Sequence, residues 1–160
     1  NFLLDNENIF NFVILRYFNV AGADSKLRSG QLSKKSTHLI KILSEVATGK
    51  RGSIDIFGND YNTPDGTAVR DYIHVSDLAD IHLMAGKYLI ENRISNIFNC
   101  GYEKGYSVLE VLNTANKLTK NSIDFKFVKR RDGDVEKLVA KTKKLNNTTS
   151  QKREYNAKNN

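Results

Sequence analysis

Phe12-Val-Ile-Leu-Arg-Tyr-Phe18 is a continuous run of strand-forming residues without apolar–polar alternation. Such a run is typical of a strand that is buried on both faces, as in a parallel sheet covered by helices. The next residues, Asn19-Val-Ala-Gly-Ala23, are small and break the run. A loop of this kind after a parallel strand is where α/β proteins bind their ligands, so the stretch predicts both a fold class and the place of a site.

Helix and strand patterns alternate along the rest of the chain. Helices are expected from about residue 36 to residue 49, after a cap at Ser76 or Asp77, and after the capping box Ser107-x-x-Glu110. Strands are expected at residues 54–57, 69–75, 96–99 and 123–127, the last with its apolar residues at alternate positions. This order predicts an α/β or α+β fold.

The charge of the chain is concentrated at one end. The 160 residues carry a formal net charge of +7, and six basic residues and one acidic residue within 141–160 account for +5 of it. We expect this polar segment to be a solvated, poorly ordered tail. Its basic residues have no interleaved aromatic side chains to stack on bases, which disfavours a nucleic-acid partner. The longest apolar run has four residues, and a membrane span needs about 20, so no membrane partner is expected.

Cysteine and histidine offer no metal or redox centre in this sequence. Cys100 is the only cysteine, which excludes an intramolecular disulfide and favours a reducing, cytoplasmic setting. His74 and His82 are eight residues apart across a strand-to-helix junction, which is no ordinary ligand spacing. Asp77 and Asp80 suit the first turn of a helix because of its dipole alone. His82 falls on the apolar stripe of that helix, so we expect no metal site.

Two arginine-containing segments leave a structural and a functional interpretation open. Arg70 follows a loop rich in Asp, Gly and Thr, where its guanidinium can bind a phosphate or pair with the neighbouring Asp71. Arg130-Arg-Asp-Gly-Asp134 can bind a diphosphate and a ribose, or it can form a solvated charged turn. On the residues alone, the charged turn is favoured for the second segment, and neither interpretation is favoured for the first.

Several stretches together resemble the UDP-glucose 4-epimerase family, a branch of the extended short-chain dehydrogenase/reductases. They follow that family's order and spacing, and the resemblance covers about residues 12–140. The block from Ile56 to Asp80 is its most specific part. The matching stretches are Val13–Ala23, Thr37–Ile40, Ile56–Thr67, Val69–Asp80, Asn96–Asn99 and Arg130–Asp134.

The resemblance implies an α/β fold that is the carboxy-terminal part of an extended short-chain dehydrogenase. Residues 1–140 would form the UDP-sugar-binding portion, with two strands of the NAD-domain Rossmann sheet, and residues 141–160 the tail. The resemblance also implies the family's reaction. A bound NAD oxidises C4 of UDP-glucose or UDP-galactose, and the 4-keto sugar takes the hydride back on its other face. Family members commonly form homodimers.

The family's binding residues map onto this sequence through the resemblance. They comprise one contact to NAD and nine contacts to the UDP-sugar. Phe18 matches the backbone contact to the nicotinamide end of NAD, Asn19 a UDP-sugar contact, His38 and Leu39 a contact at a helix N-terminus, Asp55, Ile56 and Phe57 the strand beside the uracil, Arg70 and Arg131 the diphosphate clamps, and Asp134 the ribose contact. The family often has Asn where His38 stands.

The sequence departs from the family at both ends. It contains no G-x-G-x-x-G or G-x-x-G-x-x-G loop and no Tyr followed by Lys four residues later, so no catalytic residue is assigned. At the other end, Leu138 stands near a position where the family has Tyr. We expect the chain to begin after the NAD-phosphate loop and the catalytic Tyr-x-x-x-Lys.

These departures have a consequence for stability and activity. Strands of a parallel sheet without their neighbours expose apolar side chains and unpaired amides. We therefore expect the chain alone to be marginally stable, to aggregate and to lack epimerase activity. A complementary amino-terminal chain would restore the enzyme. The alternative is a non-catalytic nucleotide-sugar binding module or the remnant of a decayed gene.

Overall fold

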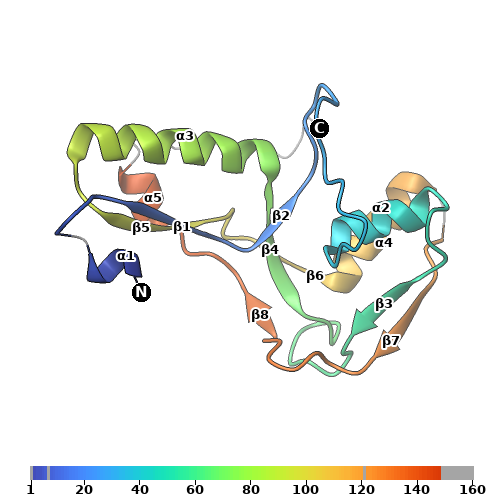
Figure 1. Cartoon of the computed structure of the whole chain (residues 1–160). Coiled ribbons are helices and arrows are strands. Elements are labelled where there is room, and N and C mark those ends of the chain that lie inside the picture. The colour runs from blue at the N-terminus through green and yellow to red at the C-terminus, as the bar shows by residue number, and fades with distance from the viewer. Residues whose placement is uncertain (1, 7, 121, 149–160) are drawn as a thin grey trace.

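The computed structural model describes residues 2–6, 8–120 and 122–148. Its elements are α1 (Phe2–Asp5), β1 (Val13–Tyr17), β2 (Asn19–Ala21), α2 (Leu39–Ala47), β3 (Ile54–Phe57), β4 (Val69–His74), α3 (Val75–Asn92), β5 (Asn96–Cys100), β6 (Gly105–Ser107), α4 (Val108–Thr119), β7 (Phe125–Val128), β8 (Lys137–Leu138) and α5 (Lys143–Thr148). Figure 1 shows two groups of elements: α3 lies along β1 and β5, and α2 and α4 lie beside β3 and β7. Strand β4 runs between the two groups.

The first group is built on the parallel pair β1 and β5. Val13 lies opposite Asn96, and Tyr17 lies opposite Cys100. Helix α3 packs against this sheet, and Phe98 of β5 is fully buried in the shared core. The parallel strand predicted from the run 12–18 is confirmed, and the α/β fold class is confirmed with it. The expected burial on both faces is wrong: Val13, Ile14 and Leu15 are half-buried, and Arg16 and Tyr17 are exposed, because β1 belongs to a sheet of only two strands among the described residues.

The second group is built on the parallel pair β3 and β7, against which α2 and α4 pack. The predicted capping box starts α4: Glu110 N donates to Ser107 Oγ at 3.0 Å, and Ser107 N donates to Glu110 Oε2 at 2.7 Å. The two bonds satisfy amides that a helix N-terminus would otherwise leave unpaired. The buried core of this group consists of Leu43, Ile54, Ile56, Leu112 and Ile123.

Strand β4 connects the two groups. It pairs with β2 and β8 in parallel and with β6 antiparallel. Asn19–Ala21, expected to be a loop, is therefore a short strand. Only Phe18 separates β1 from β2, and at this residue the chain exchanges β5 for β4 as its neighbour.

Helix α2 begins at Leu39, three residues later than expected from the sequence. The buried hydroxyl of Ser36 accepts a hydrogen bond from the His38 amide at 3.2 Å, and His38 has an extended backbone. The side-chain bond therefore holds this segment in a turn before the helix starts.

Helix α3 begins at Val75, and its cap is His74 rather than Ser76 or Asp77. The Ser76 amide donates to His74 Nδ1 at 3.2 Å. The imidazole of His74 thus accepts the capping hydrogen bond that Ser, Thr, Asp or Asn side chains usually accept at a helix N-terminus. His82 of the same helix is exposed, so its predicted place on the buried stripe is wrong.

The alternation of residues 123–127 gave the correct strand but the wrong exposure. Ile123 is buried, whereas Phe125 and Phe127 are each 42% exposed and pack against each other with ring centroids 5.5 Å apart. Alternation determines which side chains share a face, but it does not determine whether another element covers that face.

Residues 141–148 differ from the predicted solvated tail. Helix α5 places the buried Leu145 in the core cluster of β5 and α3. The first residues of the basic segment are therefore part of the fold. Residues 149–160 lie outside the described residues, and the expectation for them remains a prediction.

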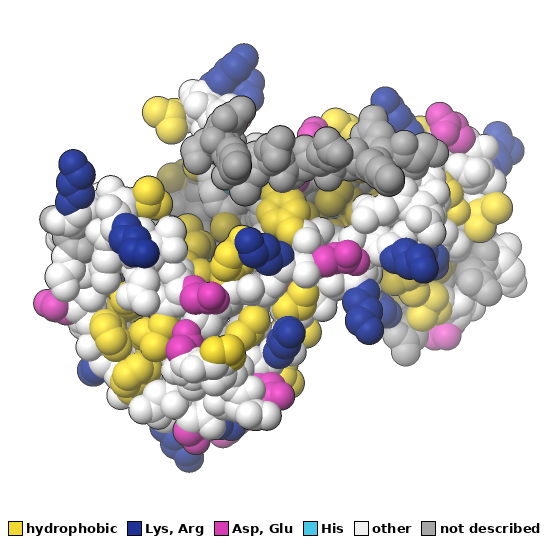
Figure 2. Space-filling model, turned by 180° about the vertical axis from the view of Figure 1, so that it is seen from behind, with side chains coloured by type: hydrophobic (Ala, Val, Ile, Leu, Met, Phe, Trp, Pro, Cys, Tyr) yellow, Lys and Arg dark blue, Asp and Glu magenta, His cyan; other side chains and the backbone are white. Residues whose placement is uncertain are grey.

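Large hydrophobic side chains are exposed on this chain, and Figure 2 shows such side chains in several patches on the rear face. Some of them flank the β1–β5 group, with Ile9, Leu83 and Ile90 each more than two-thirds exposed. Among the described residues, no helix is both long and apolar enough to cross a bilayer. The same residues contain no group of three or more His, Cys, Asp or Glu placed to hold a metal ion.

The carboxylate of Asp71 fixes β4 to the segments that surround it. Asp71 is 1% exposed and accepts hydrogen bonds from the amides of Tyr102, Glu103 and Ala140 at 3.1 to 3.2 Å. Gly101 permits this approach, because a Cβ there would lie 2.5 Å from Asp71 Oδ2. One buried side chain therefore joins three separate positions of the backbone.

We expect Asp71→Ala to destabilise the chain by about 3 kcal/mol, because three backbone amides, among them that of the buried Ala140, lose a charged acceptor. Hydrogen exchange should show it as faster exchange at Tyr102, Glu103 and Ala140. The exposed Asp132 gives the control, and Asp132→Ala should leave exchange at these amides unchanged. Equal exchange in the two variants would contradict the role of Asp71.

Candidate functional site

A cleft of about 840 Å³ is lined by residues of strands β2, β3, β4 and β7, of helices α2 and α4, and of the loops beside them. It brings together eight of the ten binding residues predicted from the sequence. These are Asn19 of β2, Leu39 of α2, Asp55, Ile56 and Phe57 of β3, Arg70 of β4, and Arg131 and Asp134 from the segment between β7 and β8. Residues far apart in the sequence thus share one cavity.

His38 and Phe18 are the two predicted residues that do not line this cleft. The side chain of His38 is exposed beside the N-terminus of α2. Phe18 is partly buried at the junction of β1 and β2. The roles given to them by resemblance remain predictions.

Arg70 reaches the cleft because β4 alternates its side chains between two faces. Asp71 and Ile73 are buried on one face, whereas Arg70 and Tyr72 line the cleft from the other. An ion pair between Arg70 and Asp71 is therefore not formed. Instead, Arg70 Nη1 donates to Val69 O at 2.9 Å, and Arg70 Nη2 lies 3.6 Å from Asp134 Oδ1.

The neighbouring Arg130 and Arg131 have different roles in the structure. The guanidinium of Arg131 lies over the ring of Phe57, 3.8 Å from its centroid, on the wall of the cleft. Arg130 stays outside the cleft lining. It pairs with Asp60 at 2.6 Å and lies over the ring of Tyr61. Arg131 is therefore available to a ligand, whereas Arg130 holds the loop that contains Asp60 and Tyr61.

The loop between β3 and β4 is held by Asp65. Its Oδ1 accepts from the amide and the hydroxyl of Thr67 at 2.9 and 2.7 Å, and its Oδ2 accepts from Ser107 Oγ. Burial alone raises the pKa of Asp65, but the hydrogen bonds from Ser107 and Thr67 outweigh it, so the pKa is lowered. The loop is thereby joined to the start of α4, and the strands on both sides of it keep their positions in the cleft.

Thirteen residues that line the cleft were not predicted from the sequence, and four of them are basic. Lys34, Lys35, Arg51 and Lys126 line it together with the two predicted arginines. The acidic residues that line it are Asp55 and Asp134, of which Asp55 pairs with Lys126 at 3.5 Å. The surplus of positive charge, next to the positive N-terminal end of α2, favours an anionic ligand. No sequence signal marked Lys34 or Lys35, since they stand in a polar segment without periodicity.

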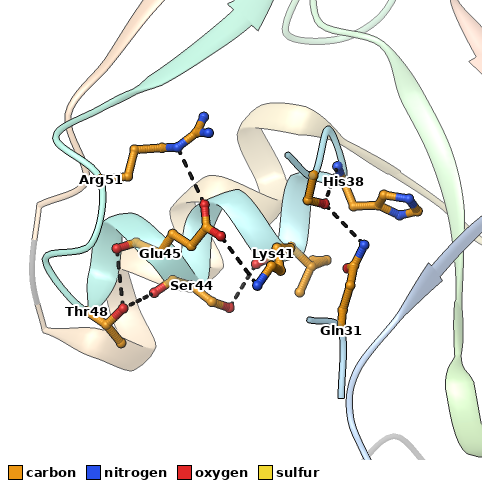
Figure 3. A network of polar contacts seen from close by, with 9 residues as sticks. Gln31, His38, Lys41, Ser44, Glu45, Thr48 and Arg51 are labelled. Carbon is orange, nitrogen blue, oxygen red and sulfur yellow. Dashed lines mark hydrogen bonds and ion pairs between the residues drawn. The ribbon is translucent and has the colours of Figure 1, made fainter. Parts of the chain in front are cut away.

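A polar network on α2 holds one edge of the cleft, as Figure 3 shows. Glu45 Oε1 lies 3.4 Å from Lys41 Nζ, and Glu45 Oε2 lies 3.5 Å from Arg51 Nε. Near the start of the helix, Gln31 Nε2 donates to the buried Ser36 Oγ at 3.1 Å. These contacts keep Arg51 and the helix N-terminus beside the cleft.

Tyr72 is the tyrosine that lines the cleft among the described residues. Burial raises its pKa to about 12, and the nearby Arg70 offsets this only in part. A phenol with a raised pKa stays protonated at neutral pH and is a poor general base. The side chain of Tyr72 therefore serves the cleft as a wall rather than as a base.

The fold and this cleft define an α/β protein with a positively charged cleft at the edges of its parallel strands. The chain belongs to the NAD dependent epimerase/dehydratase family, whose match covers residues 4–101.

Within this family, the chain is similar to UDP-glucose 4-epimerases. The UDP-glucose 4-epimerase of Azospirillum brasilense is 51% identical over 128 residues, which cover 80% of this chain and 37% of that protein. The human UDP-glucose 4-epimerase is 42% identical over 134 residues, which cover 83% of this chain and 38% of that protein. The chain therefore spans less than half the length of these relatives.

Solved structures of UDP-glucose 4-epimerases also match most of this chain, and the match again covers less than half of their length. The UDP-glucose 4-epimerase of Stenotrophomonas maltophila with bound NAD and formylated UDP-arabinopyranose matches with a TM-score of 0.87 at 34% identity, over 93% of this chain and 46% of that one. The enzyme of Bifidobacterium longum in complex with NAD⁺ and UDP matches with a TM-score of 0.82 at 33% identity, over 93% of this chain and 44% of that one.

We expect Gly66→Ala to destabilise the chain by at least about 2 kcal/mol. Gly66 has a φ of +77°, and a Cβ there would lie 2.2 Å from the backbone oxygen of Asn59. Gly52, which lines the cleft, has ordinary φ and no atom within 4 Å of such a Cβ. Gly52→Ala is thus the matched control in urea unfolding, and equal midpoints for the two variants would contradict the account.

Proposed function

We propose that this chain is the UDP-sugar-binding portion of a UDP-glucose 4-epimerase, which interconverts UDP-glucose and UDP-galactose. One observation carries the proposal: Arg70 and Arg131, 61 positions apart in the sequence, line the same cleft together with Asp134. Two guanidinium groups in one cleft suit a diphosphate, because each offers a planar fork of donors to phosphate oxygens.

The remaining lining residues support a place for each part of the ligand. Asp55, Ile56 and Phe57 of β3 line the cleft where the uracil would lie, and Asp134 offers an acceptor for ribose hydroxyls. Asn19 lines the same cleft from β2 and is the residue that we assign to the hexose. Epimerisation requires that the hexose turn over while the nucleotide stays bound. Binding free energy concentrated on the UDP portion meets that requirement.

NAD is the cofactor of the family, and it accepts and returns the hydride in the family's reaction. The residues of this chain do not make an NAD site by themselves. A dinucleotide pyrophosphate needs a glycine-rich turn before a helix N-terminus, and the 160 residues contain no such motif. Only Phe18, at the carboxyl end of the parallel strand β1, is matched to NAD. We therefore derive no chemical step within this chain.

We further propose that two segments of polypeptide supply different parts of the enzyme. Residues 1–140 supply the UDP-sugar contacts and two strands of the NAD-domain sheet, and a complementary amino-terminal segment supplies the base and the NAD-phosphate loop. The second candidate is a non-catalytic nucleotide-sugar binding module or the remnant of a decayed gene. Coexpression with an upstream segment that carries Tyr-x-x-x-Lys separates the two, because only the first predicts recovered activity.

Removal of either cleft arginine should weaken UDP binding. We expect Arg70→Ala and Arg131→Ala each to cost about 1.5–3 kcal/mol in calorimetric titrations with UDP, because each removes a charge-assisted bond to the diphosphate. Lys129→Ala removes the same charge from an exposed side chain that does not line the cleft, and it should cost less than about 0.5 kcal/mol. A chain that does not bind UDP, or three variants with equal affinity, would overturn the proposal.

The chain alone should not convert UDP-galactose when NAD is supplied. It should also unfold over a broad range of temperature, because β1 and β5 form a parallel sheet of two strands with apolar side chains exposed around it. A coupled assay for UDP-glucose and a calorimetric melt measure the two properties. A sharp cooperative melt together with turnover would show that the chain is a complete enzyme.

A further inference from the structure

Arg130 is held by the loop that follows β3. Its Nε donates to Asp60 Oδ1 at 2.6 Å, and its Nη2 donates to the backbone oxygen of Asp60. The guanidinium carbon also lies 3.9 Å from the ring centroid of Tyr61, a residue that is only 5% exposed. An arginine fork that meets two oxygens and rests on a buried ring has a defined position.

Gly58 makes room for these contacts. It has a φ of +82°, and a Cβ there would lie 2.7 Å from Arg130 Cγ and 2.6 Å from Tyr61 Cε2. The Gly58 amide also donates to Val128 O at 2.9 Å, which extends the pairing of β3 with β7 into the loop. The backbone of the loop is therefore shaped to receive the side chain of Arg130.

Arg131 has much less support of its own. It is exposed, and its guanidinium lies 3.8 Å from the centroid of the Phe57 ring. Within the described part of the chain, no hydrogen bond or ion pair holds that guanidinium. A single cation–π contact at an exposed site is worth less than the rotamer entropy that an arginine loses when it is fixed. The ring of Phe57 therefore does not by itself keep Arg131 in the cleft.

The two arginines contact consecutive parts of one segment. Arg131 lies over Phe57, the last residue of β3, and Arg130 binds residues 60 and 61 of the loop that follows it. Because residues 130 and 131 are adjacent, the bonds of Arg130 fix the backbone from which the side chain of Arg131 reaches Phe57.

We propose that Arg130 is a positioning residue for diphosphate binding, which acts through Arg131 and does not touch the ligand. The inference rests on the UDP-sugar binding proposed above. Arg130 does not line the cleft, whereas Arg131 does. A guanidinium that is already in place loses less conformational freedom when a phosphate binds it, so the ligand binds more tightly.

Arg130→Ala tests the inference in calorimetric titrations of the full 160-residue chain with UDP. Without the contacts to Asp60 and Tyr61, the side chain of Arg131 has to be ordered when the ligand binds, so UDP affinity should fall roughly three- to ten-fold. Lys129→Ala is the matched control, because it removes the same charge from an exposed neighbour outside the cleft lining. It should change the affinity by less than about two-fold.

The same substitution in an Arg131→Ala background separates positioning from a general structural effect. If Arg130 acts through Arg131, the double variant should bind UDP within about two-fold of the affinity of Arg131→Ala alone. Loss of charge or of loop structure would instead weaken binding by the same factor in both backgrounds. Circular dichroism verifies the fold of each variant. If Arg130→Ala does not fold, Arg130→Lys replaces it, since lysine keeps the charge but lacks the planar fork.

Each outcome decides the matter. A loss of UDP affinity that exceeds that of Lys129→Ala and disappears in the Arg131→Ala background supports the inference. An affinity equal to that of Lys129→Ala, or an equal loss with and without Arg131, overturns it and leaves the proposed function standing. Failure of UDP to bind the unaltered chain overturns the proposed function itself, so the two failures are distinguishable.

Discussion

The buried carboxylate of Asp71 is the constraint on which the arrangement of the cleft depends. Asp71 binds three backbone amides from the segments after β5 and before α5, and it thereby fixes the face that β4 turns to the core. Because a strand alternates its side chains, Arg70 must then point to the other face, into the cleft. Adjacent residues of opposite charge thus serve different purposes. Asp71 holds segments of the fold together, and Arg70 lines the cleft.

In the charged turn after β7, two adjacent residues again have different roles, as Asp71 and Arg70 do in β4. Arg130 binds Asp60 and Tyr61 and so holds the loop that follows β3, while Arg131 rests on Phe57 at the cleft. The loop and the turn therefore hold each other in place. Lys34, Lys35, Arg51 and Lys126 also line the cleft, so Arg70 and Arg131 lie in a region of positive potential.

The positions of strands and helices were predicted from the sequence better than the burial of their side chains. Continuous apolar runs and a capping box are local signals, so β1 and the start of α4 were predicted correctly. Whether another element covers a side chain is a tertiary property. The alternation of residues 123–127 therefore missed the exposure of Phe125 and Phe127, and the polar composition of residues 141–160 missed the burial of Leu145. The gathering of Asn19, Arg70 and Arg131 in one cleft was implied only by the resemblance to a family. Spacing along the chain contains no information about such long-range proximity.

A crystal structure of the chain with UDP would decide whether Arg70 and Arg131 bind a diphosphate. We expect the diphosphate to lie between the two guanidinium groups, with the uracil beside Asp55–Phe57. A UDP molecule bound elsewhere, or one whose diphosphate touches neither arginine, would contradict this expectation.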